Sequence, residues 1–152
     1  MGPMAEVVFR STQHLGDADL RALATFLKDL PERAPPAARP REVPADVIAL
    51  GSRLYGTHCA ECHGERGEGG GSTYAALAGH RGVTMASHAN LVKVVIHGGF
   101  PPTTAGNSRP YGMPPFGQAL TDAEIAAIAS FVRGAWGNAA PGVTALDVQR
   151  LR

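Results

Sequence analysis

The sequence predicts an all-α fold whose helices and loops enclose a group that is not protein. Apolar residues recur at helical spacing in several segments, and no run of alternating residues is long enough for a convincing strand. Between Gly64 and Gly117 the chain has 12 glycines and five prolines in 54 residues. A compact domain rarely holds so much loop unless the loops wrap around a non-protein core.

The first helix is predicted to follow Gly16 and to end at Pro31, which cannot continue a helix. Two aspartates in its first turn interact favourably with the helix dipole. Four leucines repeat at steps of three, four and three: Leu20, Leu23, Leu27 and Leu30. Residues 1–31 are therefore expected to be a helical segment. Residues 32–44 are expected to be a linker, because prolines interleaved with Ala and Arg are typical of a stiff, extended chain.

The main domain is predicted to span residues 45–140. Its first helix begins after Pro44 and runs toward the cysteines. The interior Gly51 costs about 1 kcal/mol relative to alanine, which indicates that another helix approaches closely there. A second helix is expected at 90–97, where apolar residues form a stripe.

The last strong helix is predicted to begin at Thr121, whose hydroxyl forms a Thr-x-x-Glu capping box with Glu124. Apolar residues at helical spacing continue it through Trp136, and Gly137 is the expected terminator. Residues 141–152 are expected to be a tail that contains a short helix between 144 and 151.

An internal repeat relates the first segment to the last helix. A shift of 105 positions aligns seven pairs of identical or similar residues: Leu15 with Leu120, Asp17 with Asp122, Ala18 with Ala123, Leu20 with Ile125, Leu23 with Ile128, Phe26 with Phe131, and Leu27 with Val132. Residues 1–31 therefore look like the end of a preceding copy of the main domain.

Composition and charge argue against several classes of function. The chain has 14 basic and 13 acidic residues, so a net charge of +1 gives no global field for nucleic acid or an anionic membrane. The longest strongly apolar stretch, 125–132, is far shorter than the roughly 20 residues that cross a bilayer. The first residues of this chain lack the basic region, apolar core and cleavage site of a secretory signal peptide.

The two cysteines, Cys59 and Cys62, are separated by two residues, and His63 follows directly. Two thiols at this spacing can each add to a vinyl group of one haem, and the adjacent histidine then lies under the iron. We predict one covalently attached haem c. A thiol–disulfide redox protein is an alternative, although no strand precedes the pair as thioredoxin-like folds require. A structural zinc site needs four ligands, and a second cysteine pair is missing.

Iron bound by His63 needs a sixth ligand, and Met113 is the predicted one. Two prolines directly after it stiffen the chain, and glycines on either side allow tight turns. The other candidates for the sixth ligand are expected to play ordinary structural roles: Met4, Met85, His80, His88 and His97. Met85, for example, is expected to fill a gap in the core. A His/Met pair saturates the iron and raises its reduction potential, which suits electron transfer. The alternative is a haem enzyme or gas sensor with a labile methionine.

These motifs resemble the class I cytochrome c family over about residues 45–137. The resemblance rests on Cys59-Ala60-Glu61-Cys62-His63, on Gly112-Met113-Pro114 and on the capped helix after Thr121. Four short motifs resemble a narrower group more closely: Leu77-Ala78-Gly79, His97-Gly98-Gly99-Phe100, Thr104-Ala105-Gly106-Asn107 and 111–116. That group is the C-terminal haem domain of the multi-haem cytochrome c subunit of bacterial membrane-associated alcohol, aldehyde and sugar-acid dehydrogenases. The implied fold is that of class I cytochrome c with an extra N-terminal helix.

The resemblance also implies two structural contacts. Gly51 would meet Phe131 where the first and last helices of the domain cross. The ring of His63 would hydrogen-bond a backbone carbonyl just before Leu77. In this sequence two alanines occupy that place instead of the usual prolines.

Further residues are expected to surround the haem, again by resemblance. Arg81 would pair with a haem propionate. The segment from Tyr111 through Pro114 to residue 116 would exclude water from the iron. Met4 occupies the place of the axial methionine of a preceding domain and is expected to bind no iron in this chain.

The implied function is electron transfer rather than enzymatic catalysis. Electrons would come from a periplasmic dehydrogenase and leave to a quinone, another cytochrome or an oxidase. Haem attachment of this kind takes place outside the cytoplasm, so the expected location is the periplasmic face of a bacterial inner membrane. Membrane association would come only through partner proteins.

Overall fold

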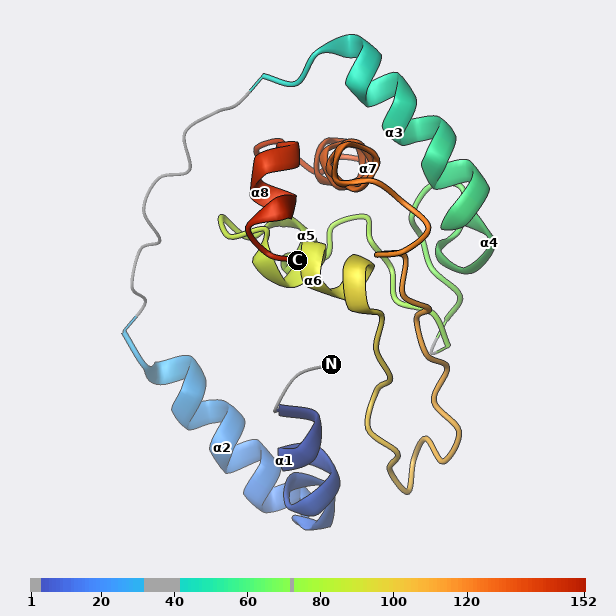
Figure 1. Cartoon of the computed structure of the whole chain (residues 1–152). Coiled ribbons are helices and arrows are strands. Elements are labelled where there is room, and N and C mark those ends of the chain that lie inside the picture. The colour runs from blue at the N-terminus through green and yellow to red at the C-terminus, as the bar shows by residue number, and fades with distance from the viewer. Residues whose placement is uncertain (1–3, 32–41, 72) are drawn as a thin grey trace.

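The computed structural model describes residues 4–31, 42–71 and 73–152, and these residues form helices joined by long loops (Figure 1). The helices are α1 (Met4–Arg10), the 3-10 turn η1 (Thr12–His14), α2 (Asp17–Asp29), α3 (Ala45–His58), α4 (Ala60–His63), α5 (Arg81–Thr84), α6 (Ala89–His97), α7 (Asp122–Gly134) and α8 (Ala145–Gln149). Extended pairing within the described residues is limited to three isolated bridges, so the all-α prediction is confirmed.

The core forms where α3 crosses α7 (Figure 1). A methyl group at Gly51 would lie 2.1 Å from the carbonyl oxygen of Ala127 and 2.9 Å from the Cβ of Phe131, so only glycine allows this approach. The contact that the interior glycine predicted is therefore present. It fixes the end of α3 from which the cysteine-containing turn begins.

Three shorter helices pack around α7. Val92 of α6, Ile125 of α7 and Val148 of α8 are fully buried in one apolar cluster. The buried Arg133 of α7 donates hydrogen bonds to the carbonyl oxygens of Val83, at 2.6 Å, and of Pro141, at 2.7 Å. These bonds connect α7 to α5 and to the segment before α8.

The helix predictions agree with the structure except near Trp136. The expected helix continues to that residue, but α7 ends at Gly134 because Ala135 is extended and Trp136 has a left-handed φ of 54°. The short helix α1 has no counterpart among the sequence-based expectations. The predicted linker, 32–44, lies outside the described residues except for 42–44.

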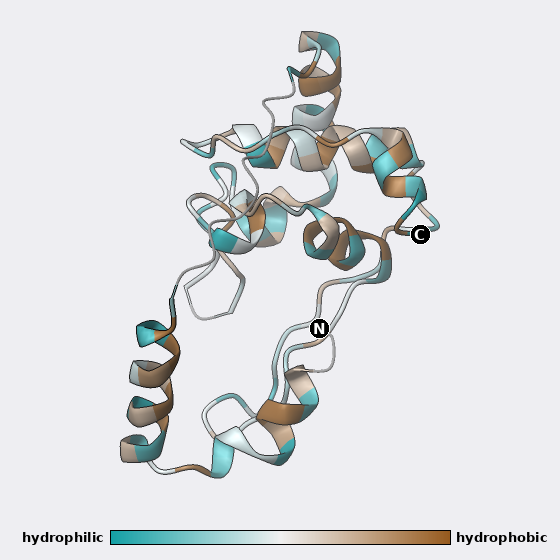
Figure 2. Ribbon diagram, turned by 90° about the vertical axis from the view of Figure 1, so that its left-hand side faces the viewer, coloured by the Kyte–Doolittle hydropathy of each residue, from teal (hydrophilic) through white to brown (hydrophobic). Residues whose placement is uncertain are grey.

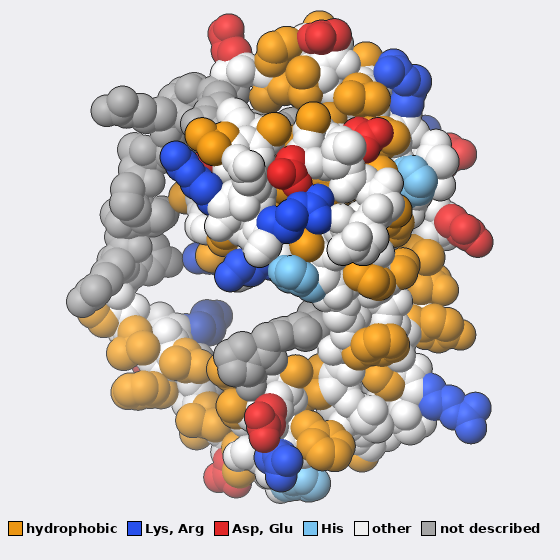
Figure 3. Space-filling view, viewed as in Figure 1, with side chains coloured by type: hydrophobic (Ala, Val, Ile, Leu, Met, Phe, Trp, Pro, Cys, Tyr) orange, Lys and Arg blue, Asp and Glu red, His pale blue; other side chains and the backbone are white. Residues whose placement is uncertain are grey.

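The extra N-terminal helix is present, and its apolar residues are exposed. No residue of α1 or α2 is buried. Figure 2 shows hydrophobic residues along α2, and in Figure 3 they gather on the surface at the lower left. The most exposed apolar side chains of α2 are Phe26, at 64%, and Leu27, at 63%. Within the described part of the chain, no helix has the length and apolar character to cross a bilayer.

Residues 99–113 form a long loop, called the excursion below, that begins and ends beside α6. Gly99 and Met113 form an antiparallel bridge at its base, and Thr104 and Asn107 form another near its tip. Figure 1 shows residues 99–113 projecting away from the helices between these points. Both ends of the excursion are thus fixed at one place.

Candidate functional site

The cysteine-containing turn is continuous with the helix that forms the core. The backbone N–H of Cys59 donates to Tyr55 O at 2.9 Å, and Cys59 O accepts from the N–H groups of Cys62, at 3.2 Å, and His63, at 2.9 Å. Both thiols are free; Cys59 is half-buried and Cys62 is exposed. One turn therefore presents two thiols and an imidazole.

The His63 ring has a defined orientation. Its Nδ1 lies 2.8 Å from the carbonyl oxygen of Ala75, so Nδ1 carries the proton and the lone pair of Nε2 is left for a metal. The expected hydrogen bond from the His63 ring to a backbone carbonyl just before Leu77 is thus confirmed. Gly67 O holds this loop by accepting from the N–H groups of Leu77, at 2.7 Å, and Ala78, at 3.0 Å.

Asn138 secures the same loop from the other side, and the sequence analysis missed it. Its Nδ2 donates to Leu77 O at 3.1 Å and to Val132 O at 2.8 Å, and its Oδ1 accepts from Gly79 N at 2.9 Å. Only 5% of Asn138 is exposed. The sequence offers only a local signal, an asparagine directly after Gly137 at a helix end, whereas two of its three partners lie about 60 residues away.

Asn138→Ala should lower the free energy of unfolding by about 3 kcal/mol, because three backbone groups, one buried and two in half-buried hydrogen bonds, would lose their partner. Denaturant unfolding followed by far-UV circular dichroism measures this change. Asn90→Ala is the control, since Asn90 is exposed on α6. A loss below about 1 kcal/mol in the Asn138 variant would mean that water replaces the side chain without cost.

Met113 is held through its backbone at the base of the excursion. Its N–H donates to Gly99 O at 2.8 Å, and its carbonyl accepts from Gly99 N at 3.0 Å. Its half-buried side chain packs against the same apolar cluster as Cys59. Gly98, with φ 64°, lies so close that a Cβ there would meet Met113 O at 2.4 Å. Glycine at this position lets the methionine segment lie against the end of α6.

An aromatic pair connects the methionine segment with the cysteine turn. The rings of Tyr111 and Tyr74 lie 5.4 Å apart, and Tyr111 is 63% exposed. Desolvation, and then the neighbouring Cys62 thiol, raise the pKa of Tyr74. Tyr74 is therefore close to both Tyr111 and Cys62. Pro114, just beyond, is exposed.

A second aromatic cluster supports the turn from inside. Tyr55 lies 5.6 Å from Phe131 and 5.0 Å from Trp136 between ring centres, and its hydroxyl donates to Gly64 O. Burial raises the pKa of Tyr55 to about 12. The indole of Trp136 covers Gly67, where a Cβ would meet the ring at 2.6 Å. The departure of Trp136 from the helix brings its ring to the loop that follows His63.

The remaining candidate residues lie apart from these contacts or at the surface. Arg81 is exposed at the first position of α5, so its pairing with a propionate stays a prediction. Met85 is 42% exposed, and the expectation that it fills a gap in the core is wrong. Met4 is 64% exposed in α1. The three other candidate histidines lie at helix ends: His80 before α5, His88 before α6, and His97 at the end of α6.

The donor set fits a haem attached through two thioether bonds. Two thiols share one turn, the adjacent imidazole has Nε2 available, and a methionine comes from a separately anchored segment. Burial, and then the neighbouring Cys62, raise the pKa of the Cys59 thiol to about 11. That thiol is therefore protonated near neutral pH, unlike the thiolates of disulfide oxidoreductases.

Comparisons with known proteins show which proteins this chain is similar to. The family model described as cytochrome c matches residues 48–136. The chain is 38% identical to the cytochrome c subunit of the quinone alcohol dehydrogenase of Gluconobacter oxydans, over 99% of this chain and 34% of that protein. It is 34% identical to the gluconate 2-dehydrogenase cytochrome c subunit of Pantoea cypripedii, over 99% of this chain and 36% of that protein. It is 31% identical to the fructose dehydrogenase cytochrome subunit of Gluconobacter japonicus, over the same shares. The chain thus spans about a third of the length of these relatives.

Proposed function

Because the chain belongs to the cytochrome c family, we propose that it transfers electrons through one haem c bound by Cys59 and Cys62. When bound, the haem supplies one-electron cycling between ferric and ferrous iron. His63 would bind the iron through Nε2, and Met113 would bind it through its thioether sulfur. Neither ligand needs to leave the iron during the transfer.

The protein residues hold the ligands and exclude water. Ala75 O fixes the His63 ring in one plane and increases the basicity of Nε2. Gly99 and Gly98 fix the backbone of Met113. The segment from Tyr111 through Pro114 would cover the methionine side of the haem, and Arg81 would pair with a propionate.

The single observation that supports this proposal most strongly is the 2.8 Å contact between His63 Nδ1 and Ala75 O. A histidine whose Nδ1 proton is already bonded offers Nε2 to a metal. In a thiol–disulfide protein, nothing would require this orientation. The raised pKa of the Cys59 thiol also disfavours that alternative.

The relatives' names suggest the partners. These relatives are cytochrome subunits of alcohol, gluconate and fructose dehydrogenases. We therefore propose that this chain receives electrons in a dehydrogenase complex at the periplasmic face of a bacterial inner membrane. It would pass the electrons to a quinone, another cytochrome or an oxidase.

The N-terminal segment is proposed to be the end of a preceding haem domain. The 105-residue repeat aligns α2 with α7, and the α2 residues that match the buried Ile125 and Val132 are exposed. In this proposal residues 1–31 belong to that domain, 32–44 are the linker, 45–140 form the haem domain, and 141–152 are its tail. Intact mass of the protein from its natural host tests the division, and a mass equal to this chain plus one haem would contradict it.

A pyridine haemochrome assay combined with intact mass tests the proposed function. We expect one haem per chain that survives acid–acetone extraction, and a low-spin ferric spectrum with a methionine-to-iron charge-transfer band. A colourless protein with two titratable thiols would contradict haem binding. A high-spin ferric spectrum with rapid carbon monoxide binding would support a haem enzyme or gas sensor instead.

A further inference from the structure

The segment that follows Met113 is held on one side by α6. Phe116 N donates to Val95 O at 2.9 Å, and Gly117 N donates to Ile96 O at 3.0 Å. Val95 and Ile96 lie in the last turn of α6, where carbonyl groups have no partner within the helix. These two bonds hold the backbone of residues 116 and 117 against the end of α6.

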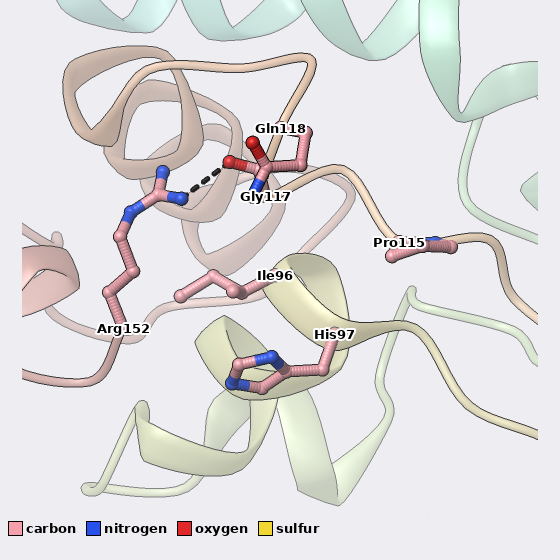
Figure 4. A pocket seen from close by; sticks show the side chains of 6 residues that line it. All are labelled: Ile96, His97, Pro115, Gly117, Gln118 and Arg152. Carbon is pink, nitrogen blue, oxygen red and sulfur yellow. Dashed lines mark hydrogen bonds between the residues drawn. The ribbon is translucent and has the colours of Figure 1, made fainter.

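A single side chain, Arg152, bonds the carbonyl groups of the same segment on its other side. Its guanidinium donates to Gly117 O, as Figure 4 shows, and to Leu120 O at 3.2 Å, and its Nε lies 2.8 Å from Oδ1 of Asp122. Arginine suits this position because its planar guanidinium presents five N–H donors in a fixed arrangement. One residue thus reaches three acceptors between the methionine segment and the start of α7.

The backbone of Arg152 is itself well anchored. Thr144 and Asp147 form a capping box at the start of α8, and Val148 is fully buried against the core. Leu151 N donates to Val148 O at 2.9 Å. The side chain of Arg152 therefore extends from a fixed point.

Little packing supports the segment where Arg152 contacts it. A cavity of about 430 Å³ opens there, lined by Ile96, His97, Pro115, Gly117, Gln118 and Arg152 (Figure 4). Phe116 and Leu120 pack against the core, but the backbone at Gly117 borders this cavity, so the hydrogen bonds of Arg152 add to what holds the segment there.

The backbone contacts of Arg152 matter more than its ion pair. The side chains of Arg152 and Asp122 are 34% and 28% exposed, and ion pairs open to water contribute little. A charged donor bonded to a backbone carbonyl is among the stronger hydrogen bonds. Gly117 O and Leu120 O are therefore the decisive acceptors.

We propose that Arg152 is a positioning residue for Met113, which keeps the segment 114–120 closed and slows release of the thioether from the iron. This inference rests on the proposed His63 and Met113 ligation. The guanidinium itself does not touch the iron site. It acts through the backbone between Gly117 and Leu120.

The rate at which imidazole binds to the ferric haem protein tests this proposal, because imidazole can enter only when the methionine has left. Arg152→Ala should bind imidazole about tenfold faster, the factor that about 1.4 kcal/mol produces. Hydrogen exchange at the Gly117 amide should accelerate by a similar factor. Arg152→Lys, which keeps the charge but has only one ammonium group, should give an intermediate rate.

Two control variants separate this role from general effects. Arg150→Ala removes an exposed arginine two residues earlier and should leave the imidazole rate unchanged. Asp122→Asn removes the ion pair but leaves both carbonyl contacts, so its rate should stay within about twofold of the wild type.

The possible outcomes distinguish the inference from the proposed function. If the wild-type protein lacks the methionine-to-iron charge-transfer band, the ligation is wrong and the role of Arg152 is wrong with it. If the band is present but Arg152→Ala binds imidazole at the wild-type rate, only the role of Arg152 is wrong. An equal acceleration in Arg150→Ala would also overturn it, since the effect would then reflect charge alone.

Discussion

Met113→Ala should convert the ferric protein from low spin to high spin and lower its midpoint potential by roughly 0.1–0.3 V. The physical reason is that the thioether stabilises ferrous iron, and axial ligands together set haem potentials over a range of about 0.8 V. The haem should stay covalently attached, because both thiols remain. Absorbance in the near infrared and a spectroelectrochemical titration measure the two changes.

Met85→Ala is the matched control for this experiment. Met85 is 42% exposed and directly follows α5, so its removal should leave both spectrum and potential unchanged. Loss of the charge-transfer band in the Met85 variant, with retention in the Met113 variant, would reassign the ligand. An unchanged potential in Met113→Ala would contradict methionine ligation by that residue.

Gly51→Ala should lower the free energy of unfolding by about 3 kcal/mol, near the upper end for an overpacked core. The added methyl group would lie 2.1 Å from Ala127 O and 2.6 Å from the carbonyl carbon, and neither is a flexible side-chain atom. The two central helices, α3 and α7, would have to separate. For a domain of this size the melting temperature should fall by about 10 °C or more.

Gly56→Ala, one and a half turns further along α3, is the matched control. A methyl group there would meet nothing within 4 Å, so alanine should stabilise the helix by about 0.5–1 kcal/mol. Calorimetry or denaturant unfolding of the two haem-bound variants should therefore give shifts of opposite sign. Equal destabilisation by both variants would show that the close contact of Gly51 with α7 does not determine the effect.

The helices and their starting points could be predicted because their signals are local. Apolar spacing identified α2 and α6, and the Thr-x-x-Glu capping box identified the start of α7. The short helix α8 lies within the predicted range 144–151. The glycine in α3 even indicated a contact between helices, since a residue that weakens a helix needs a compensating reason. These inferences depend on residues that lie within a few positions of each other.

The contacts that hold the site could not be predicted in this way. Asn138 and Arg152 bond backbone carbonyls that lie far from them in the sequence, and a carbonyl has no residue-specific signal. Trp136 continues the helical spacing, yet the backbone turns there so that its ring packs on Tyr55 and Gly67. Exposure of Met85 likewise depends on how α5 packs, which periodicity does not specify.

The backbone bridge at the base of the 99–113 excursion lets the projecting residues change in evolution while the position of Met113 is kept. Gly99 and Met113 hold each other through backbone bonds, so residues near the tip, around Thr104 and Asn107, should tolerate insertion, deletion or replacement without displacing the proposed iron ligand. A cytochrome built in this way can adapt the projecting residues to a new protein neighbour while its redox chemistry is inherited intact.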